Sequence, residues 1–346
     1  MTSPGESRRI VIAGATSLRG KELVEALEQS KLAAAAEFRL LDEEIVAGAL
    51  TEAGGEPVVV LAVDEDSFER AQLVIFAGGA NFAVTHVEEA LRAGAAVVDM
   101  SGGLLGRAGA RVSIPSLDAL LPPSDRDPAS SISRERTGRV YISPNAAATV
   151  ACSLSAALAE WPTCRLAVFL LQPVSERGSE GIEELEAQTL KLLSIQPIAQ
   201  PVFDEQVAFN LLDRYGEAST ERLSDAREVV ALAVKTYLDG RAPLPALQLI
   251  QAPAFFSFAF SAYAEFDSVP DLAAVDARLE AGGLKFAAPG DPAPTNVRAG
   301  GEATPLLSHA ERDPNRPNGV WFWGAVDNLR LAAANAAAVS EPAVGL

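Results

Sequence analysis

The chain has 346 residues, enough for two domains with sizeable cores, and 49% of them are hydrophobic, as in ordinary globular proteins. Its formal net charge of −18 argues against a nucleic-acid-binding protein, because an acidic surface repels phosphates. Residues 1–8 lack the apolar core of a signal peptide, and no run approaches the ~18 apolar residues of a membrane span. The two cysteines, Cys152 and Cys164, indicate a reducing compartment. We therefore expect a cytoplasmic protein with no membrane or nucleic-acid partner.

The first half of the chain alternates short apolar runs with helical patterns, which predicts a doubly wound, Rossmann-like parallel sheet. Residues 9–13 form a nearly continuous apolar run, typical of a strand buried on both faces. The glycine turn Gly14–Gly20 and a helical spacing over 21–27 follow, so backbone N–H groups collect where a diphosphate can bind. Further strands are expected at 37–41, 57–62, 72–77, 95–99 and 139–142, a helix at 86–93, and loops at 101–109 and 122–137.

An acidic residue follows the second expected strand, about 20 residues after the glycine turn. Asp42 can accept hydrogen bonds from an adenosine ribose, and its charge would repel the extra phosphate of NADP, so the pattern favours NAD. A solvated loop after a strand explains the same residue equally well. We expect no metal site. The candidate cofactor-binding residues are Gly14, Thr16, Ser17, Leu18, Gly20, Asp42, Gly78 and Gly79.

The second half of the chain has the pattern of an α+β domain with a large, mostly antiparallel sheet. Strand-rich runs occur at 164–171, 246–266 and 320–323, helices are expected at 146–160, 180–193 and 221–237, and 287–305 reads as a loop. An Ala-rich helix at 327–341 is expected to pack on the first domain. We therefore expect a dinucleotide-binding domain over 1–145, completed by 327–341, and a second domain over 146–326.

Seven short motifs occur along the chain, namely Gly14–Gly20, Ala77–Gly79, Ser143–Asn145, Leu171–Ser175, Gly181–Leu185, Ala208–Asn210 and Trp323 with Asp327–Arg330. The aspartate-semialdehyde dehydrogenase family has similar motifs in the same order, and the chain resembles that family over nearly its whole length. The resemblance implies NAD(P) binding, a homodimer formed through the sheet of the second domain, and oxidation of a semialdehyde in amino-acid biosynthesis. It also implies a cysteine nucleophile, a histidine base and arginines that hold the substrate carboxylate and phosphate.

The positions that match these reactive residues carry other side chains in this sequence. Ala146 matches the nucleophile, Gln251 the carboxylate-binding arginine and Phe258 the histidine of the pattern Arg-x-Pro-x-x-x-Gly-His. Leu105 stands where the phosphate-binding arginine is expected, and Ser17 replaces the middle glycine of the glycine turn. The added Cβ of Ser17 would narrow the approach to a diphosphate, although its hydroxyl could hydrogen-bond one.

Nearby residues offer poor substitutes. Cys152 lies six residues after Ala146, ~9 Å along a helix, and is best explained as a buried structural cysteine. The chain has only two histidines, His86 and His309. Gln172 matches the family's active-site glutamine and Glu228 its substrate-amine carboxylate, but a structural hydrogen bond and a solvated charge explain the two residues as well.

The sequence therefore predicts a non-catalytic homologue, a pseudoenzyme, which forms a homodimer and could still bind NAD or NADP. The alternative is an NAD(P)-dependent oxidoreductase that acts on an aldehyde or semialdehyde without a cysteine, since direct hydride transfer needs only an acid and a bound nicotinamide. Its candidate proton donors are Thr149, Tyr141 and Tyr263. A dinucleotide-binding sensor is a third interpretation of the same fold.

Overall fold

The computed structural model describes residues 8–43, 48, 50–53, 56–122, 139–161, 164–268, 270–288 and 290–346. The chain forms two compact units. The first unit comprises residues 1–115, 125–145 and 332–346, and the second comprises residues 116–124 and 146–331. The loop expected at 122–137 lies outside the described residues, except for residue 122.

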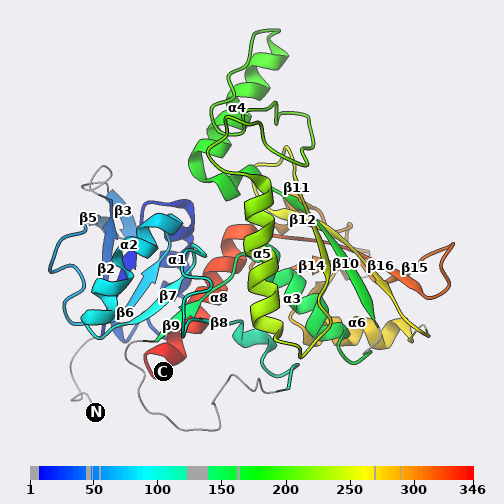
Figure 1. Cartoon of the computed structure of the whole chain (residues 1–346), viewed down its shortest axis with the longest axis horizontal. Helices are drawn as coiled ribbons and strands as arrows, with labels where there is room; N and C mark the ends of the chain where they lie inside the picture. The colour runs from blue at the N-terminus through cyan, green and yellow to red at the C-terminus, as the bar shows by residue number, and fades with distance from the viewer. Residues whose placement is uncertain are drawn as a thin grey trace. The chain divides into compact units, whose positions relative to one another are not determined.

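The first unit is built on a parallel sheet of seven strands, which confirms the fold expected for the first half of the chain (Figure 1). The strand order is β5-β2-β1-β6-β7-β9-β8, and every neighbouring pair is parallel. The strands are β1 (Arg8–Ala13), β2 (Ala36–Asp42), β5 (Leu61–Ala62), β6 (Ala71–Phe76), β7 (Ala96–Asp99), β8 (Arg111–Val112) and β9 (Val140–Ile142). The helices are α1 (Leu18–Glu28) and α2 (Ala80–Arg92), together with the last part of α8 (Asn328–Ala343).

The central strand β1 is buried on both faces, which explains its uninterrupted apolar sequence. Ile10 and Ile12 pack in one hydrophobic cluster with residues of α1 and α8, whereas Val11 and Ala13 pack in another with residues of α2. The face that α8 covers is filled by small side chains of that helix, namely Ala332, Ala333, Ala336, Ala337 and Ala343. The Ala-rich C-terminal helix therefore contributes to the core of the first unit.

The single strand expected at 57–62 is instead divided between two sheets. β4 (Glu56–Val59) forms an antiparallel hairpin with β3 (Leu50–Ala53), and β5 pairs with β2. Val58 and Val60 both pack against the same hydrophobic cluster of the first unit, so the apolar run is continuous although the pairing partner changes. An apolar run gives no information about such a change of partner.

The second unit contains a mixed, mostly antiparallel sheet, as expected. Its strand order is β11-β10-β12-β16-β14-β13, with β15 also paired to β16, and only the β10–β11 and β13–β14 pairs are parallel. The strands are β10 (Arg165–Gln172), β11 (Ala246–Gln251), β12 (Phe258–Glu265), β13 (Lys285–Phe286), β14 (Leu306–Leu307), β15 (Glu311–Arg312) and β16 (Gly319–Val326).

The helices of the second unit belong to its core, except for α4 (Gly178–Leu193), which forms a projecting arm. The others are α3 (Ala146–Leu158), α5 (Leu223–Leu238), α6 (Leu272–Ala281) and the short α7 (Asn296–Ala299). Every residue of α3 is buried, and α3 packs against α5 and α6, a helix that the sequence analysis did not identify. α4 projects from the sheet of this unit (Figure 1). Within the described ranges, no helix is both long and apolar enough to span a membrane.

Candidate functional site

Two glycine turns predicted to bind a cofactor, Gly14–Gly20 and Gly78–Gly79, meet at the carboxyl edge of the parallel sheet. Gly14 directly follows β1 and has φ +89°, and a Cβ atom there would collide with the backbone of Gly78, which follows β6. A Cβ atom at Gly20 would collide in the same way with the carbonyl oxygen of Gly14. The strand order reverses between β1 and β6, which is where a doubly wound sheet forms its ligand-binding crevice. Gly79, by contrast, faces open space and begins α2.

Ser17 is used within the first turn and not toward a phosphate. It is the N-cap of α1, and its Oγ accepts a hydrogen bond from the Gly20 N–H at 2.9 Å. The same hydroxyl is directed at the carbonyl oxygens of Gly14 (2.8 Å) and Ala77 (3.0 Å). Within the hydrogen bonds of the described residues, the N–H groups of Leu18 and Arg19 have no acceptor. These two N–H groups are the donors that the start of α1 can offer to an anion.

Asp42 is the last residue of β2 and is buried, so the interpretation as a solvated loop residue was wrong. Its Oδ2 accepts hydrogen bonds from the N–H (2.8 Å) and the hydroxyl (2.6 Å) of Thr16, and its Oδ1 accepts one from the Glu43 N–H (2.9 Å). A carboxylate can accept about four hydrogen bonds. Asp42 therefore holds the glycine turn in place and has acceptor capacity left for about one ribose hydroxyl.

Arg19, which the sequence analysis did not select, crosses this edge. Its Nη1 donates to the carbonyl oxygen of Met100 at 3.0 Å, and its Nη2 donates to that of Gly78 at 3.3 Å. Met100 follows β7, and the buried Asp99 before it accepts hydrogen bonds from Ser101 and Leu104. Burial raises the pKa of Asp99, while these hydrogen bonds and the charge of Arg19 act in the opposite direction. The sequence signal that could have identified Arg19 is its place as a charged residue at the start of the helix that the glycine turn leads into.

In the second unit, the matched positions Gln172 and Gln251 lie side by side. They pair at the ends of β10 and β11, and the Gln172 Nε2 donates to the Gln251 Oε1 at 3.2 Å. Tyr215, a residue that sequence reasoning missed, donates its hydroxyl to the same Oε1 at 2.7 Å. The Gln251 Nε2 donates to the carbonyl oxygens of Gln172 (2.9 Å) and Ala252 (3.1 Å). The fully buried Gln251 amide thus has partners on both sides and carries no charge.

Phe258 begins β12 at the same end of this sheet and is buried. The next residue of β12, Ala259, pairs with Leu171, the neighbour of Gln172. The preceding residue, Ser257, has φ +68°, a backbone conformation that favours glycine, and glycine is what the Arg-x-Pro-x-x-x-Gly-His pattern has there. This backbone geometry supports the match of Phe258 with the histidine of the pattern.

A cation does lie near these glutamines, although not at the matched position. The guanidinium of Arg177 lies over the ring of Tyr215, 6.0 Å from its centroid, and forms an ion pair with Glu221. Burial lowers the pKa of Arg177, and the nearby Glu180 and Glu184 counteract that effect. Arg177 therefore has carboxylates of its own chain around it.

Neither cysteine is poised to react. Ala146 is the first residue of α3, and Cys152 is buried in the same helix. Burial raises the pKa of the Cys152 thiol far above its usual range and raises that of the Cys164 thiol to about 12. Both side chains are thus neutral thiols near pH 7, whereas a nucleophile requires the thiolate.

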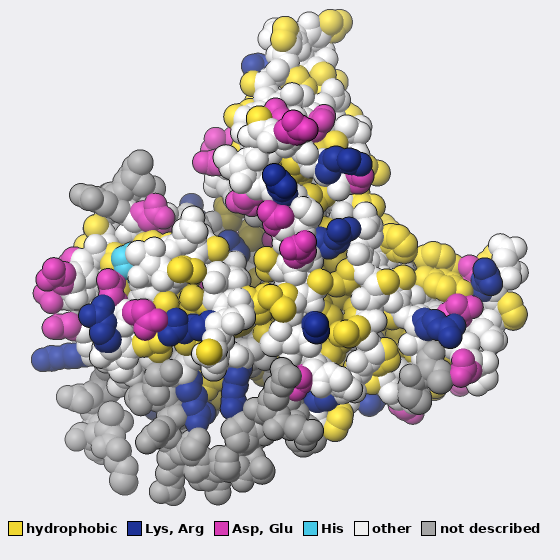
Figure 2. Space-filling model, viewed as in Figure 1, with side chains coloured by type: hydrophobic (Ala, Val, Ile, Leu, Met, Phe, Trp, Pro, Cys, Tyr) yellow, Lys and Arg dark blue, Asp and Glu magenta, His cyan; other side chains and the backbone are white. Residues whose placement is uncertain are grey.

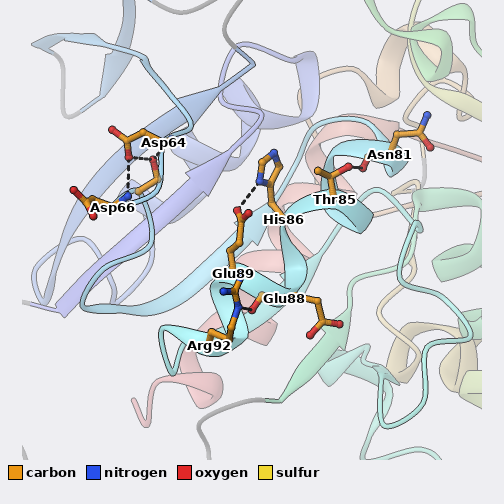
Figure 3. A network of polar contacts seen from close by, with 9 residues as sticks. Asp64, Asp66, Asn81, Thr85, His86, Glu88, Glu89 and Arg92 are labelled. Atoms are coloured by element: carbon orange, nitrogen blue, oxygen red, sulfur yellow. Dashed lines mark hydrogen bonds and ion pairs between the residues drawn. The ribbon is translucent and has the colours of Figure 1, made fainter.

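Each of the two histidines lies beside a carboxylate, and Figure 3 shows the contact of His86. His86 lies on α2 in the first unit, where its Nδ1 is 2.8 Å from the Glu89 Oε2 and its ring packs edge-on against Phe82. His309 lies in the second unit, 2.8 Å from the Asp276 Oδ2, and is exposed. Within the second unit, the His309 imidazole makes no hydrogen bond or ring contact with Gln172, Gln251 or Phe258 among the described residues.

The remaining candidates occupy separate places. Tyr141 packs against the core of the first unit, Thr149 is buried in α3, and the Tyr263 ring lies against Trp321. Glu228 is exposed on α5, and Leu105 packs against the first unit's second hydrophobic cluster. In the part of the chain that the structure describes, no three His, Cys, Asp or Glu side chains form a group that could hold a metal ion.

Comparison with known protein families gives two matches that together cover most of the chain. The semialdehyde dehydrogenase NAD-binding domain matches residues 9–116, and the semialdehyde dehydrogenase dimerisation domain matches residues 154–331. The first match contains both glycine turns and Arg19. The second contains Gln172, Gln251 and Phe258.

Individual relatives agree with these matches. The chain is 30% identical over 335 residues to a USG-1 protein homolog of Pseudomonas aeruginosa, with 96% of each chain covered. It is 24% identical to aspartate-semialdehyde dehydrogenase 2 of Vibrio cholerae, again over 96% of each chain. A solved structure of a probable aspartate-semialdehyde dehydrogenase from Pseudomonas aeruginosa superposes with a TM-score of 0.86 at 30% identity, covering 98% of this chain and 99% of the other.

Proposed function

The chain belongs to the semialdehyde dehydrogenase family, and from that premise we propose that it is a homodimeric, non-catalytic member that retains a nucleotide site. The family's covalent chemistry requires a thiolate beside a base, with guanidinium groups around the substrate anions. The single observation that carries the proposal is the closed amide network of Gln251 and Gln172. Gln251 stands at the position that we match with the family's arginine, and Gln172 at that of its active-site glutamine.

That network supports the proposal because it offers a substrate carboxylate nothing to bind. The Gln251 Oε1 accepts from Tyr215 and Gln172, and its Nε2 donates to two backbone carbonyl oxygens. An anion would have to break these buried hydrogen bonds and would gain no positive charge from Gln251 in return. Beside it, Phe258 fills its position with an apolar ring.

The state of the sulfur and imidazole groups supports the same conclusion. The Cys152 thiol is buried with a raised pKa, and within the second unit His309 pairs with Asp276 and makes no hydrogen bond with Gln172 or Gln251 among the described residues. A reduced nicotinamide can deliver a hydride directly to an aldehyde carbon while an acid protonates the carbonyl oxygen, but the three proton donors considered for that route, Tyr141, Thr149 and Tyr263, lie in three different environments.

The nucleotide site is supported by the retained geometry of the first unit, whose family match is an NAD-binding domain. Gly14, Gly20 and Gly78 keep the close backbone approaches that such a turn needs, and the Leu18 N–H is free to meet a phosphate. The site residues that we propose are Gly14, Thr16, Ser17, Leu18, Gly20, Asp42, Gly78 and Gly79, with Thr16 and Ser17 acting by shaping the turn. The carboxylate of Asp42 favours NAD over NADP.

The homodimer is supported by the dimerisation-domain match and by the uncovered face of the second unit's sheet. The strand register places Gln248, Phe169, Ser261 and Trp323 in one row across β11, β10, β12 and β16. In the next row, Tyr263 pairs with Trp321. Phe169, Trp321 and Trp323 are large, apolar and exposed, as expected of a surface that a second copy covers.

Intact-mass measurement tests the absence of covalent chemistry. The protein is incubated with aspartate semialdehyde and NADP at neutral pH, without phosphate so that an acyl-enzyme cannot be cleaved. We expect the mass to stay that of the unmodified chain. An adduct that appears in the native protein and is lost in the Cys152→Ser or the Cys164→Ser variant would contradict the proposal.

A further inference from the structure

Arg19 lies where the second half of a dinucleotide would have to pass. In a doubly wound sheet, the strands on one side of the crevice bind the adenosine half and those on the other side bind the nicotinamide half. Here the adenosine side is the β1–β2 side, which ends at Asp42, and the other side begins with β6 and β7. The Arg19 side chain starts from α1 and bonds to the residues that follow β6 and β7.

The guanidinium is held on that side by two hydrogen bonds. It donates to the carbonyl oxygens of Gly78 and Met100, at 3.3 Å and 3.0 Å. Each donated bond occupies an acceptor at the carboxyl end of the second-half strands. A nicotinamide ribose that enters there must displace Arg19 and leave these carbonyl groups to find other donors.

The adenosine side has no such obstruction. The Asp42 carboxylate has acceptor capacity left for a ribose hydroxyl, and the N–H groups of Leu18 and Arg19 are available to a phosphate at the start of α1. The Arg19 side chain also brings a positive charge to the crevice, which favours a ligand whose negative charge ends there.

We infer that Arg19 closes the nicotinamide half of the crevice, so that the site takes an adenosine diphosphate in preference to a complete dinucleotide. This inference rests on the proposed nucleotide site and specifies its ligand class. It also assigns to Arg19 a role in specificity that is separate from the loss of the reactive groups in the second unit. The recognised ligand ends at its second phosphate, beside the guanidinium.

Calorimetric titration of the full chain with ADP, ADP-ribose and NAD tests the inference. We expect ADP to bind at least about 10-fold more tightly than ADP-ribose or NAD. In Arg19→Ala, the preference for ADP over NAD should shrink to about 2-fold or reverse, because the second half of the crevice is open. Arg19→Lys, which keeps the charge but cannot bridge two carbonyl groups, should fall between the two proteins.

Lys21→Ala is the matched control, since it removes the same charge from an exposed position two residues further along α1. It should leave the ratio of the two affinities unchanged, and a thermal melt of each variant checks that it folds. NAD bound by the unmodified protein as tightly as ADP would overturn the inference and leave the nucleotide site intact, as would an unchanged ratio in Arg19→Ala. If neither the unmodified protein nor Arg19→Ala binds any of the three nucleotides, the nucleotide site itself is refuted.

Discussion

Gln251, at the position that we match with the family's carboxylate-binding arginine, is an uncharged side chain with both donors and an acceptor. An arginine at this position would be a donor only, whereas the amide both accepts from Tyr215 and donates to two backbone carbonyl oxygens. The nearby Arg177 already supplies one buried cation, held by its own carboxylates. The glutamine is therefore adapted to its present neighbours.

Gln251→Arg should accordingly destabilise the protein and not restore a substrate clamp. The new guanidinium would be fully buried, would lose both acceptor interactions and would lie near Arg177, so we expect a loss of about 3 kcal/mol or more in the free energy of unfolding. Chemical denaturation measures the change. Ala246→Arg, at an exposed position of the same strand, should have little effect, and equal losses in the two variants would refute this explanation.

Residue types could be read from the sequence at this scale, but their partners could not. The replacements that we infer at Ala146, Gln251 and Phe258 rest on motif order and stay a prediction. That Asp42 binds Thr16, or that the Ser17 hydroxyl caps α1, depends on side-chain directions that no spacing specifies. Tyr215, in an irregular segment, and Arg177, in the short helical turn before α4, were missed because the contacts of Tyr215 with Gln251 and with Arg177 exist only in the folded chain.

Helix α4 ends in a C-terminal motif that its sequence does not indicate. After Leu193, the Gln196 N–H donates to the Lys191 carbonyl oxygen and the Ile195 N–H to that of Leu192, the hydrogen bonds of a Schellman motif. The residue in the left-handed conformation is Ile195, with φ +54°, where glycine is usual. It is 96% exposed, and hydrophobic side chains are visible at the free end of the arm (Figure 2).

Ile195→Gly should therefore stabilise the arm. The side chain packs against nothing that would be lost, and a β-branched residue with positive φ is strained, so we expect a gain of about 0.5–1 kcal/mol in the free energy of unfolding. Ile195→Ala, which keeps a Cβ atom, should gain less. Thermal and urea denaturation provide the comparison, and a loss of stability in Ile195→Gly would show that the exposed isoleucine makes contacts in solution.

Two buried side chains of α4 fasten the loop that follows it. Glu184 accepts hydrogen bonds from the Val202 N–H and the Gln188 amide, and the Gln188 Oε1 accepts from the N–H groups of Val207 and Ala208. Glu184 of the motif Gly181–Leu185 is thus connected, through Gln188, to Ala208 of the motif Ala208–Asn210.

Glu184 gives the arm a specific pH dependence. Burial raises the pKa of its carboxyl above the ordinary value of 4.5, against the hydrogen bonds that it accepts. The folded chain then binds a proton more tightly than the unfolded chain, so this group's contribution to the free energy of unfolding falls as pH rises from about 4.5 through the folded pKa. The stability of the protein relative to its Glu184→Gln variant should decrease over that window in denaturation series, and a constant difference would contradict the assignment.

Most elements could be predicted because their hydrophobic period is strong, and the failures have physical reasons. β1, β6 and α4 appear within a few residues of their expected ranges. The run at 57–62 failed because one apolar stretch pairs with two different partners. α6 was missed because its charged and alanine residues give a weak stripe, with only Val275 and Leu279 buried.

The whole molecule is expected to assemble through the uncovered sheet face of the second unit. Phe169→Glu would place a carboxylate in the middle of that face, and the cost of burying it should shift the protein to monomers at micromolar concentrations. Sedimentation velocity reads the change. Val229→Glu on α5 is matched in exposure, at 40% for both residues, and should stay dimeric. A monomeric native protein, or a dimeric Phe169→Glu, would reject this face as the interface.

The fold class could be read from the sequence at this scale because alternation of strands and helices determines a parallel sheet, and the structure agrees. Its function could not, since one fold can carry different functions. In our proposal, the function depends on a few side chains at the ends of β10, β11 and β12 and on the crevice that Arg19 crosses.

The most direct measurement is steady-state turnover of aspartate semialdehyde by the purified full chain, followed by nicotinamide absorbance with NAD and NADP in turn and with phosphate present. A catalytically active family member serves as the positive control under the same conditions. We predict a rate equal to that of the protein-free blank with either cofactor. A saturable, phosphate-dependent rate that rises with protein concentration would contradict the account, and its loss in the Cys152→Ser variant would identify the sulfur responsible.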